Sequence, residues 1–179
     1  DHRDLHSFPT RRSSDLIRPV NFPCLKLAQL AAVWTQYDTL FSVILAAGSI
    51  GCIKQCFRVS PSVYWETHYN FRSVSVRKEK QVGENSLCIL LINTVVPVLF
   101  AYGVRSKQPE YCDRAIHILE SLPSEKNAIV SSFTQAGIKT GHAGDSQALV
   151  QLKREYCEKK KCLYCRIGFR YLKQISQST

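Results

Sequence analysis

The feature that most constrains the fold is an apolar run, Leu87–Tyr102, which reads LCILLINTVVPVLFAY. The run is shorter than the ~20 apolar residues that a membrane-spanning helix needs, and the polar residues Asn93 and Thr94 stand in its middle. We therefore predict a buried central helix. Because Pro97 lacks an amide proton and its ring opposes the carbonyl of Asn93, we expect a kink there, with Asn93 or Thr94 satisfying the released backbone group.

Around this run, the spacing of apolar residues and the positions of Pro, Gly and Asp predict a mostly α fold, an irregular helical bundle. A first amphipathic helix is expected over Leu25–Gln36, with one side formed by Leu27, Leu30, Ala31 and Trp34. Asp38 is the expected cap of a helix that ends at Leu45, and Asp145 the expected cap of a helix over 146–158. Further helical segments are predicted at Tyr111–Leu122, Ser124–Gly137 and Cys162–Lys173, and a short helical or irregular element at Gly51–Val59.

The first residues, Asp1–Leu16, resemble the translation of a sequencing-adapter oligonucleotide. We interpret them as an artefact and exclude them from the prediction of the fold. Residues 17–179 are then expected to form a helical C-terminal region of a larger protein, with a basic, cysteine-containing tail at 145–173.

Composition narrows the range of functions. A formal net charge of +10 and a pI near 9.3 favour an anionic partner, such as nucleic acid or an acidic neighbouring domain. Paired carboxylates, a nucleophile elbow and a phosphate-binding glycine loop are all absent, so we predict no catalytic site in this sequence. The eight cysteines do not suggest a disulfide framework, and we expect a reducing cytoplasm. Four of them are predicted to be small buried hydrophobic residues: Cys24, Cys52, Cys56 and Cys88.

Three cysteines near the C-terminus, Cys157, Cys162 and Cys165, have C-x4-C-x2-C spacing in a stretch rich in lysine and arginine. Thiolates are soft ligands, and this spacing is typical of zinc or iron–sulfur sites, so we predict a bound zinc ion or cluster. Such a site needs a fourth ligand, for which the candidates are His142, Cys112, Cys24 or a residue outside this chain. Two alternatives are that the thiols pack as apolar groups, and that Cys162 and Cys165 form a redox pair.

The same tail is a candidate surface for DNA or RNA. Between Lys153 and Lys173 the net charge is +6, and four aromatic residues are interleaved with the charges: Tyr156, Tyr164, Phe169 and Tyr171. The predicted phosphate-binding residues are Lys159, Lys160, Lys161, Arg166, Arg170 and Lys173. We predict that the aromatic residues belong to the core, with Ile167, Tyr171 and Leu172 facing inward in the last helix. No membrane partner is expected.

Several segments together resemble a bacterial family of unknown function, the domain-of-unknown-function family DUF2851. They are LLINTVVPVLFAYG at 90–103, LPSEKNAI at 122–129, DSQALVQLKREYCEKKKCLYCRIG at 145–168, and the shorter RPVNFPCLKLAQLA and YWETHYNF. The resemblance covers the tail cysteines Cys157, Cys162 and Cys165. It implies a longer parent protein whose N-terminal portion is similar to PD-(D/E)xK nucleases and whose catalytic residues are not in this chain.

The resemblance therefore leads us to expect an accessory region that supports a nuclease-like N-terminal domain of the same protein, and that helps it bind nucleic acid. The alternative is a structural or protein-interaction module without metal or nucleic acid. A thiol redox module is a third hypothesis.

Overall fold

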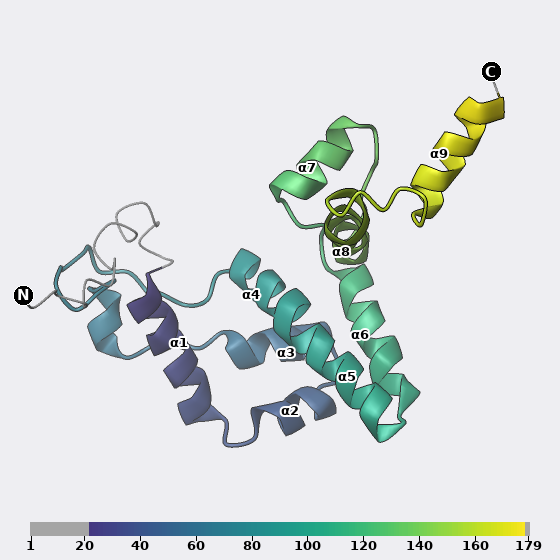
Figure 1. The fold of residues 1–179 in the computed structure, drawn as a ribbon. Helices are drawn as coiled ribbons and strands as arrows, with labels where there is room; N and C mark the ends of the chain where they lie inside the picture. The colour runs from purple at the N-terminus through teal and green to yellow at the C-terminus, as the bar shows by residue number, and fades with distance from the viewer. Residues whose placement is uncertain (1–21, 178–179) are drawn as a thin grey trace, which may run out of the picture. The chain divides into compact units, whose positions relative to one another are not determined.

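A computed structural model describes residues 22–177, which form helices joined by loops (Figure 1). Within this range there is no β-strand, only two isolated bridges, His68 with Val74 and Pro123 with His142. The predicted mostly α fold is confirmed. The chain divides into two compact units, Asp1–Leu87 and Cys88–Thr179. The supposed adapter segment lies outside the described residues.

Unit 1 consists of short helices followed by a long loop. Its elements are α1 (Pro23–Gln36), α2 (Leu40–Ala46), α3 (Ile50–Phe57), the 3-10 turn η2 (Val63–Glu66) and the start of α4 (Glu84–Leu90). Pro23 lies in the first turn of α1, where its missing amide has no cost. The core of the unit is formed by Leu25, Val33, Ile44, Ile53, Phe57, Trp65 and Leu87.

Helix α1 buries a different side from the one that its apolar residues predict. Leu27 and Trp34 are 65% and 64% exposed, whereas the buried stripe runs through Leu25, Gln29 and Val33. This stripe is held by a contact between distant parts of the chain, because Gln29 Nε2 donates to Lys80 O at 2.8 Å. The predicted orientation of α1 was therefore wrong.

The predicted central helix extends from Glu84 to Ser106 and is continuous through α4, the π-helical segment η3 (Leu91–Val95) and α5 (Val96–Ser106). The π segment ends directly before Pro97, and the Val96 N–H donates to Leu91 O. A π segment shifts the backbone hydrogen bonds by one residue, which accommodates the amide that Pro97 lacks. Asn93 Nδ2 donates to Ile89 O at 2.9 Å. A backbone distortion is therefore present at the predicted place, but the side chain of Asn93 bonds to Ile89 O and not to the Asn93 carbonyl that Pro97 deprives of its usual donor.

Burial of this helix is only partial, so the prediction of a buried central helix holds for one side of it. Leu91, Val95 and Leu99 are buried, but Asn93 and Thr94 lie on the exposed side. Of the residues described, Glu84–Ser106 is the one helix long and apolar enough to span a membrane by length and composition, and 39% of its most apolar window is buried. A core helix of a soluble protein can pass the same test.

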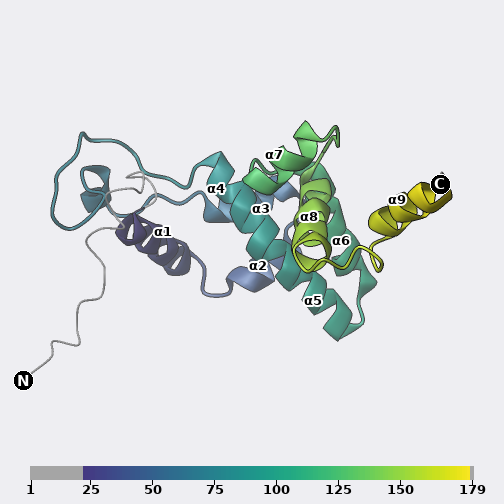
Figure 2. The ribbon, with the colours of Figure 1, turned by 45° about the horizontal axis from the view of Figure 1, so that its top comes forward.

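Unit 2 continues from α5 with α6 (Pro109–Ser121), α7 (Ala128–Gln135), α8 (Ala143–Leu152), the π segment η4 (Lys153–Cys157) and α9 (Arg166–Gln177). Helix α5 packs on α6, α6 on α8, and α8 on α7 (Figure 2). The α5–α6 approach depends on Gly103, where an added Cβ would lie 2.7 Å from Cys112 Sγ. The predicted buried face of α6 is confirmed for Ala115, Ile118 and Leu122.

Helix caps differ from prediction by a few residues. Thr39, not Asp38, precedes α2, and Asn127, whose side chain accepts from the Val130 N–H, caps α7 in place of Ser124. The cap of α8 is His142, and Asp145 is the third residue of the helix. Asp145 Oδ2 accepts from the backbone of Gly141 and His142, which completes a capping box.

Candidate functional site

The tail is shaped by a π segment, a turn and a helix. In η4 the Glu158 N–H reaches back to Lys153 O at 2.9 Å. Lys160 has a left-handed backbone, with φ of 50°, and so reverses the chain. The turn ends where α9 begins, and Gly168 contacts it so closely that an added Cβ would lie 2.7 Å from Cys162 O. The segment 158–165 therefore has a defined path despite its exposure.

All six predicted phosphate-binding residues are exposed. Lys159, Lys160 and Lys161 occupy the turn, and the other three lie on α9. Arg166, Arg170 and Lys173 are separated by four and three residues, so they share one face of this helix. Lys159 Nζ pairs with Glu155, and this hydrogen bond is the main reason that the pKa of Glu155 is lowered. The tail thus presents a basic surface in which the carboxylate of Glu155 is paired with Lys159.

Two of the tail's aromatic residues are exposed, against the prediction that they belong to the core. Tyr164 is 82% and Phe169 52% exposed, and Ile167, predicted to face inward, is 62% exposed. Tyr156 is half-buried. The prediction failed because helical spacing assigns residues to a face without showing whether anything covers it. The side chains of Tyr171 and Leu172 lie outside the described residues.

The three tail cysteines differ in environment. Cys157 and Cys162 are exposed, whereas Cys165 is buried. Among residues 22–177, no group of three or more His, Cys, Asp or Glu side chains is placed to hold a metal ion. His142, a candidate fourth ligand, serves instead as the cap of α8, where its Nδ1 accepts from the Asp145 N–H at 3.4 Å. The zinc or iron–sulfur site therefore stays a prediction.

The remaining cysteines fit their predicted role only in part. Cys56 is buried, as expected. Cys52 is exposed, and Cys24 and Cys88 are half-buried, so the prediction of small buried hydrophobic residues was wrong for Cys52. In α3 the Cys56 thiol donates to Cys52 O at 3.3 Å, which gives it a local structural role.

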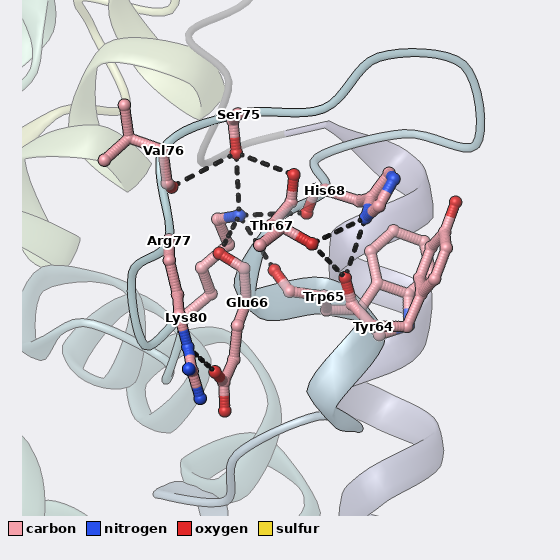
Figure 3. A network of polar contacts seen from close by, with 9 residues as sticks. All are labelled: Tyr64, Trp65, Glu66, Thr67, His68, Ser75, Val76, Arg77 and Lys80. Atoms are coloured by element: carbon pink, nitrogen blue, oxygen red, sulfur yellow. Dashed lines mark hydrogen bonds and ion pairs between the residues drawn. The ribbon is translucent and has the colours of Figure 1, made fainter.

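A second polar site, in unit 1, was missed by the sequence analysis. Lys80 is only 5% exposed and pairs with no carboxylate among residues 22–177. Its ammonium donates to Trp65 O at 2.8 Å, Glu66 O at 3.0 Å and His68 O at 3.1 Å (Figure 3). Ser75 Oγ lies at 3.2 Å and the centre of the Tyr69 ring at 3.9 Å. The charge is therefore stabilised by backbone dipoles and an aromatic face.

This network fixes the loop between η2 and α4. Burial lowers the pKa of Lys80, while the carbonyl oxygens favour its charged form and oppose that shift. An exposed ion pair between Arg77 Nε and Glu66 Oε2, at 2.6 Å, closes the same loop. Beside the network lies a cavity of about 220 Å³, lined by Lys26 and Gln29 among others. Because the Lys80 ammonium already donates hydrogen bonds to these oxygens, Lys80 serves as a structural cation and not as a nucleophile.

Nothing in the local sequence separates Lys80 from its neighbours. The segment Lys78-Glu79-Lys80 has the alternating charges of a solvated loop, and Lys78 and Glu79 are indeed exposed. The nearest signal is the preceding aromatic cluster, since Tyr69 provides the ring face. The three accepting carbonyls belong to backbone positions that any residue could occupy, so only the folded loop reveals the site.

The fold and the tail define a mostly α-helical protein with a basic, cysteine-containing C-terminal segment. The chain belongs to the family described as protein of unknown function (DUF2851), whose model matches residues 9–128, more than half of the chain. The comparisons with curated proteins and with solved structures returned no match. The family match contains the segment 90–103, one of the segments that carry the resemblance. It ends before the tail, so the arguments about the tail rest on this chain's own residues.

Proposed function

We propose that this chain is a cytoplasmic accessory region that binds nucleic acid through its tail and serves a nuclease-like domain of a longer parent protein. The observation that supports this most directly is the exposed basic surface of the tail, with Tyr164 and Phe169 uncovered among its charges. A metal ion or cluster at the tail cysteines belongs to the same proposal as a stabiliser of the turn.

Electrostatics favours a polyanion as the ligand. Phosphate groups are bound by lysine and arginine, and each contact releases counterions from the nucleic acid. The α9 stripe of Arg166, Arg170 and Lys173 extends over two turns of helix, so its charges can follow a phosphate backbone instead of meeting at one small anion. Exposed aromatic side chains add stacking surface, which phosphate binding alone does not require.

The test is fluorescence anisotropy of labelled DNA and RNA oligonucleotides titrated with the 179-residue chain. For three phosphate contacts on duplex DNA, affinity should fall about 40-fold between about 50 and 200 mM salt. The charge reversal R166E/R170E/K173E should weaken binding at least as strongly. The matched control, R105E/K126E/K139E, changes the net charge equally at exposed residues outside the tail and should have a much smaller effect.

Two results would contradict the proposal. One is the absence of binding at micromolar protein in low salt. The other is an equal loss of affinity in the two triple variants, which would indicate attraction by net charge alone. Vesicles containing phosphatidylserine provide a further arm, because a basic helix can also bind an anionic membrane surface. Binding to vesicles without binding to oligonucleotides would overturn the proposal in favour of a membrane partner.

A protein-interaction role is the second candidate, and α1 provides the observation that favours it. Leu27, Leu30 and Trp34 are exposed at helical spacing and form an apolar stripe. The proposed occupant is the N-terminal domain of the same parent protein. If that domain is added in trans, W34A should weaken the complex without altering oligonucleotide binding. Equal capture of wild-type chain and W34A would contradict this role.

A further inference from the structure

An open hollow of about 580 Å³ lies in the tail, beside η4 and the turn that follows it. It is lined by Gln151, Glu155, Tyr156, Lys161 and Tyr164. This volume falls within the range of small-ligand sites, about 300–1,000 Å³. The hollow combines two aromatic rings, a cation, a carboxylate and an amide. A surface that binds only by charge needs no aromatic rings, and an apolar docking groove needs no charged groups.

The backbone holds the lining residues in place. The Lys161 N–H donates to Tyr156 O at 2.9 Å, and the Tyr164 N–H donates to Lys161 O at 3.1 Å. These bonds link the two tyrosines through the lysine between them. Tyr164 is the more exposed ring, at 82%, and an exposed ring that lines a hollow has a face available for stacking. Every nucleobase has a π-face that can stack on such a ring.

The polar residues of the hollow match the edge of a base. Glu155 uses Oε2 to pair with Lys159, and its other carboxylate oxygen has no hydrogen bond recorded within residues 22–177. A carboxylate accepts from the exocyclic amine of cytosine. The Gln151 amide can donate to the base carbonyl or ring nitrogen. Thymine and uracil carry no amine, so this edge discriminates against them.

We infer that the hollow binds one unpaired, amine-bearing base of a single-stranded nucleic acid, with the base stacked on Tyr164 and its amine facing Glu155. Lys161 is placed to contact the adjoining phosphate. The inference rests on the proposed nucleic-acid function and adds a substrate class to it. In a duplex the base faces are stacked on their neighbours, so Tyr164 has no base face on which to stack, and binding in the hollow requires an unpaired base.

The experiment compares oligocytidylate, oligothymidylate and a duplex of equal length by anisotropy at one salt concentration. Oligocytidylate should bind about fivefold tighter than oligothymidylate, the lower end of what a good base-edge contact provides. Tyr164→Ala should weaken single-strand binding about 5- to 100-fold, the range of one stacked base. The same variant should leave duplex binding nearly unchanged. Tyr164→Trp should restore single-strand binding, and Leu163→Ala, an exposed neighbour outside the hollow, is the matched control.

Glu155→Gln isolates base-edge recognition, because the glutamine amide can accept from the cytosine amine or donate to thymine O4, so the preference for cytosine should shrink while stacking persists. If Tyr164→Ala weakens single strands and duplex equally, or not at all, the inference is overturned while the proposed function stands. The absence of any cytosine preference in the wild-type chain also overturns it. If no oligonucleotide binds, the proposed function and the inference that rests on it are both contradicted. Binding to anionic vesicles would then identify a membrane surface as the alternative ligand.

Discussion

Two lysine-bearing segments of this chain use the same side chain in opposite ways. In unit 1, Lys80 is buried and its ammonium is surrounded by oxygens of η2 and of the loop that follows it. In the tail, Lys159, Lys160 and Lys161 are exposed on a turn. Both segments are rich in charge, and both follow or contain aromatic residues. The difference is that three carbonyls of unit 1 converge on one ammonium group, whereas the carbonyls of the tail turn accept hydrogen bonds from backbone N–H groups.

The consequence is a division between stability and binding. A buried ammonium that donates to several carbonyls contributes to stability, since its removal takes a charged donor away from each of them in a buried site. Exposed lysines contribute little to folding, because water and salt screen them. They remain available to an anionic partner. The contrast predicts that lysine substitutions in the two segments affect different measurements.

The largest expected effect is that of Lys80→Met. Methionine keeps the apolar stem but removes the charged donor from three carbonyls; Trp65 O and Glu66 O keep a backbone N–H donor, and His68 O loses its donor. Unfolding free energy should fall by roughly 3 kcal/mol. Urea unfolding followed by tryptophan fluorescence measures the loss, since Trp65 lies in the network. The control is Lys78→Met, which should change stability by less than about 0.5 kcal/mol. Equal effects of the two substitutions would remove the contrast.

The next effect concerns the tail's own order. In Gly168→Ala the new methyl carbon would lie 2.7 Å from Cys162 O and 3.2 Å from Cys162 Cα, so α9 must shift away from the turn. We expect a local cost of about 1–3 kcal/mol. It would appear as faster hydrogen exchange in 158–170 with unit 1 unaffected. Gly51→Ala, with its nearest neighbour at 3.6 Å, is the permissive control and should stabilise α3 slightly. Unchanged exchange in the tail would show that α9 does not depend on this contact.

The sequence predicts an element well when its limits are set by nearby residues, and poorly when they are set by contacts between distant parts of the chain. Helix α6 was predicted correctly because Pro109 and Pro123 mark its two ends in the sequence. The buried side of α1 was not, because the hydrogen bond from Gln29 to Lys80 joins residues 51 positions apart. In the candidate site, the charges of the tail were predicted from composition alone. The hollow beside Tyr164 was not, because it requires the π segment and the left-handed Lys160, neither of which has a clear sequence signal.

The reactivity of the tail cysteines tests whether the tail contains a metal ion, and so whether the exposed tail has a stabilising centre of its own, as unit 1 has in Lys80. Without a bound ion, Cys157 and Cys162 should react with iodoacetamide at least tenfold faster than the buried Cys165, since alkylation requires access. With a bound zinc or iron–sulfur cluster, all three should be protected until a chelator is added. Metal analysis of protein purified without chelator accompanies the measurement. Fast reaction of Cys157 and Cys162 with no zinc or iron present would refute the metal prediction. A disulfide between Cys162 and Cys165 under mild oxidation would favour the redox hypothesis.

The smallest expected effect is that of the exposed pair formed by Glu155 and Lys159. The pKa of Glu155 is lowered, first by its hydrogen bond to Lys159, so the folded protein releases this proton more readily than the unfolded chain. The resulting stabilisation is present above the ordinary pKa of 4.5 and is lost as pH falls through the lower, folded value. Glu155→Gln should therefore melt slightly below wild type near neutral pH and coincide with it in acid.

Added salt provides the control, because screening of the ion pair should also remove the difference in melting temperature between Glu155→Gln and wild type at neutral pH. The comparison between the two segments then requires that Glu155→Gln change stability far less than Lys80→Met, while only the former changes the base preference of the tail. A large, salt-insensitive loss of stability in Glu155→Gln would mean that the tail pair is structural. The division between a stabilising buried lysine and binding exposed lysines would then no longer hold.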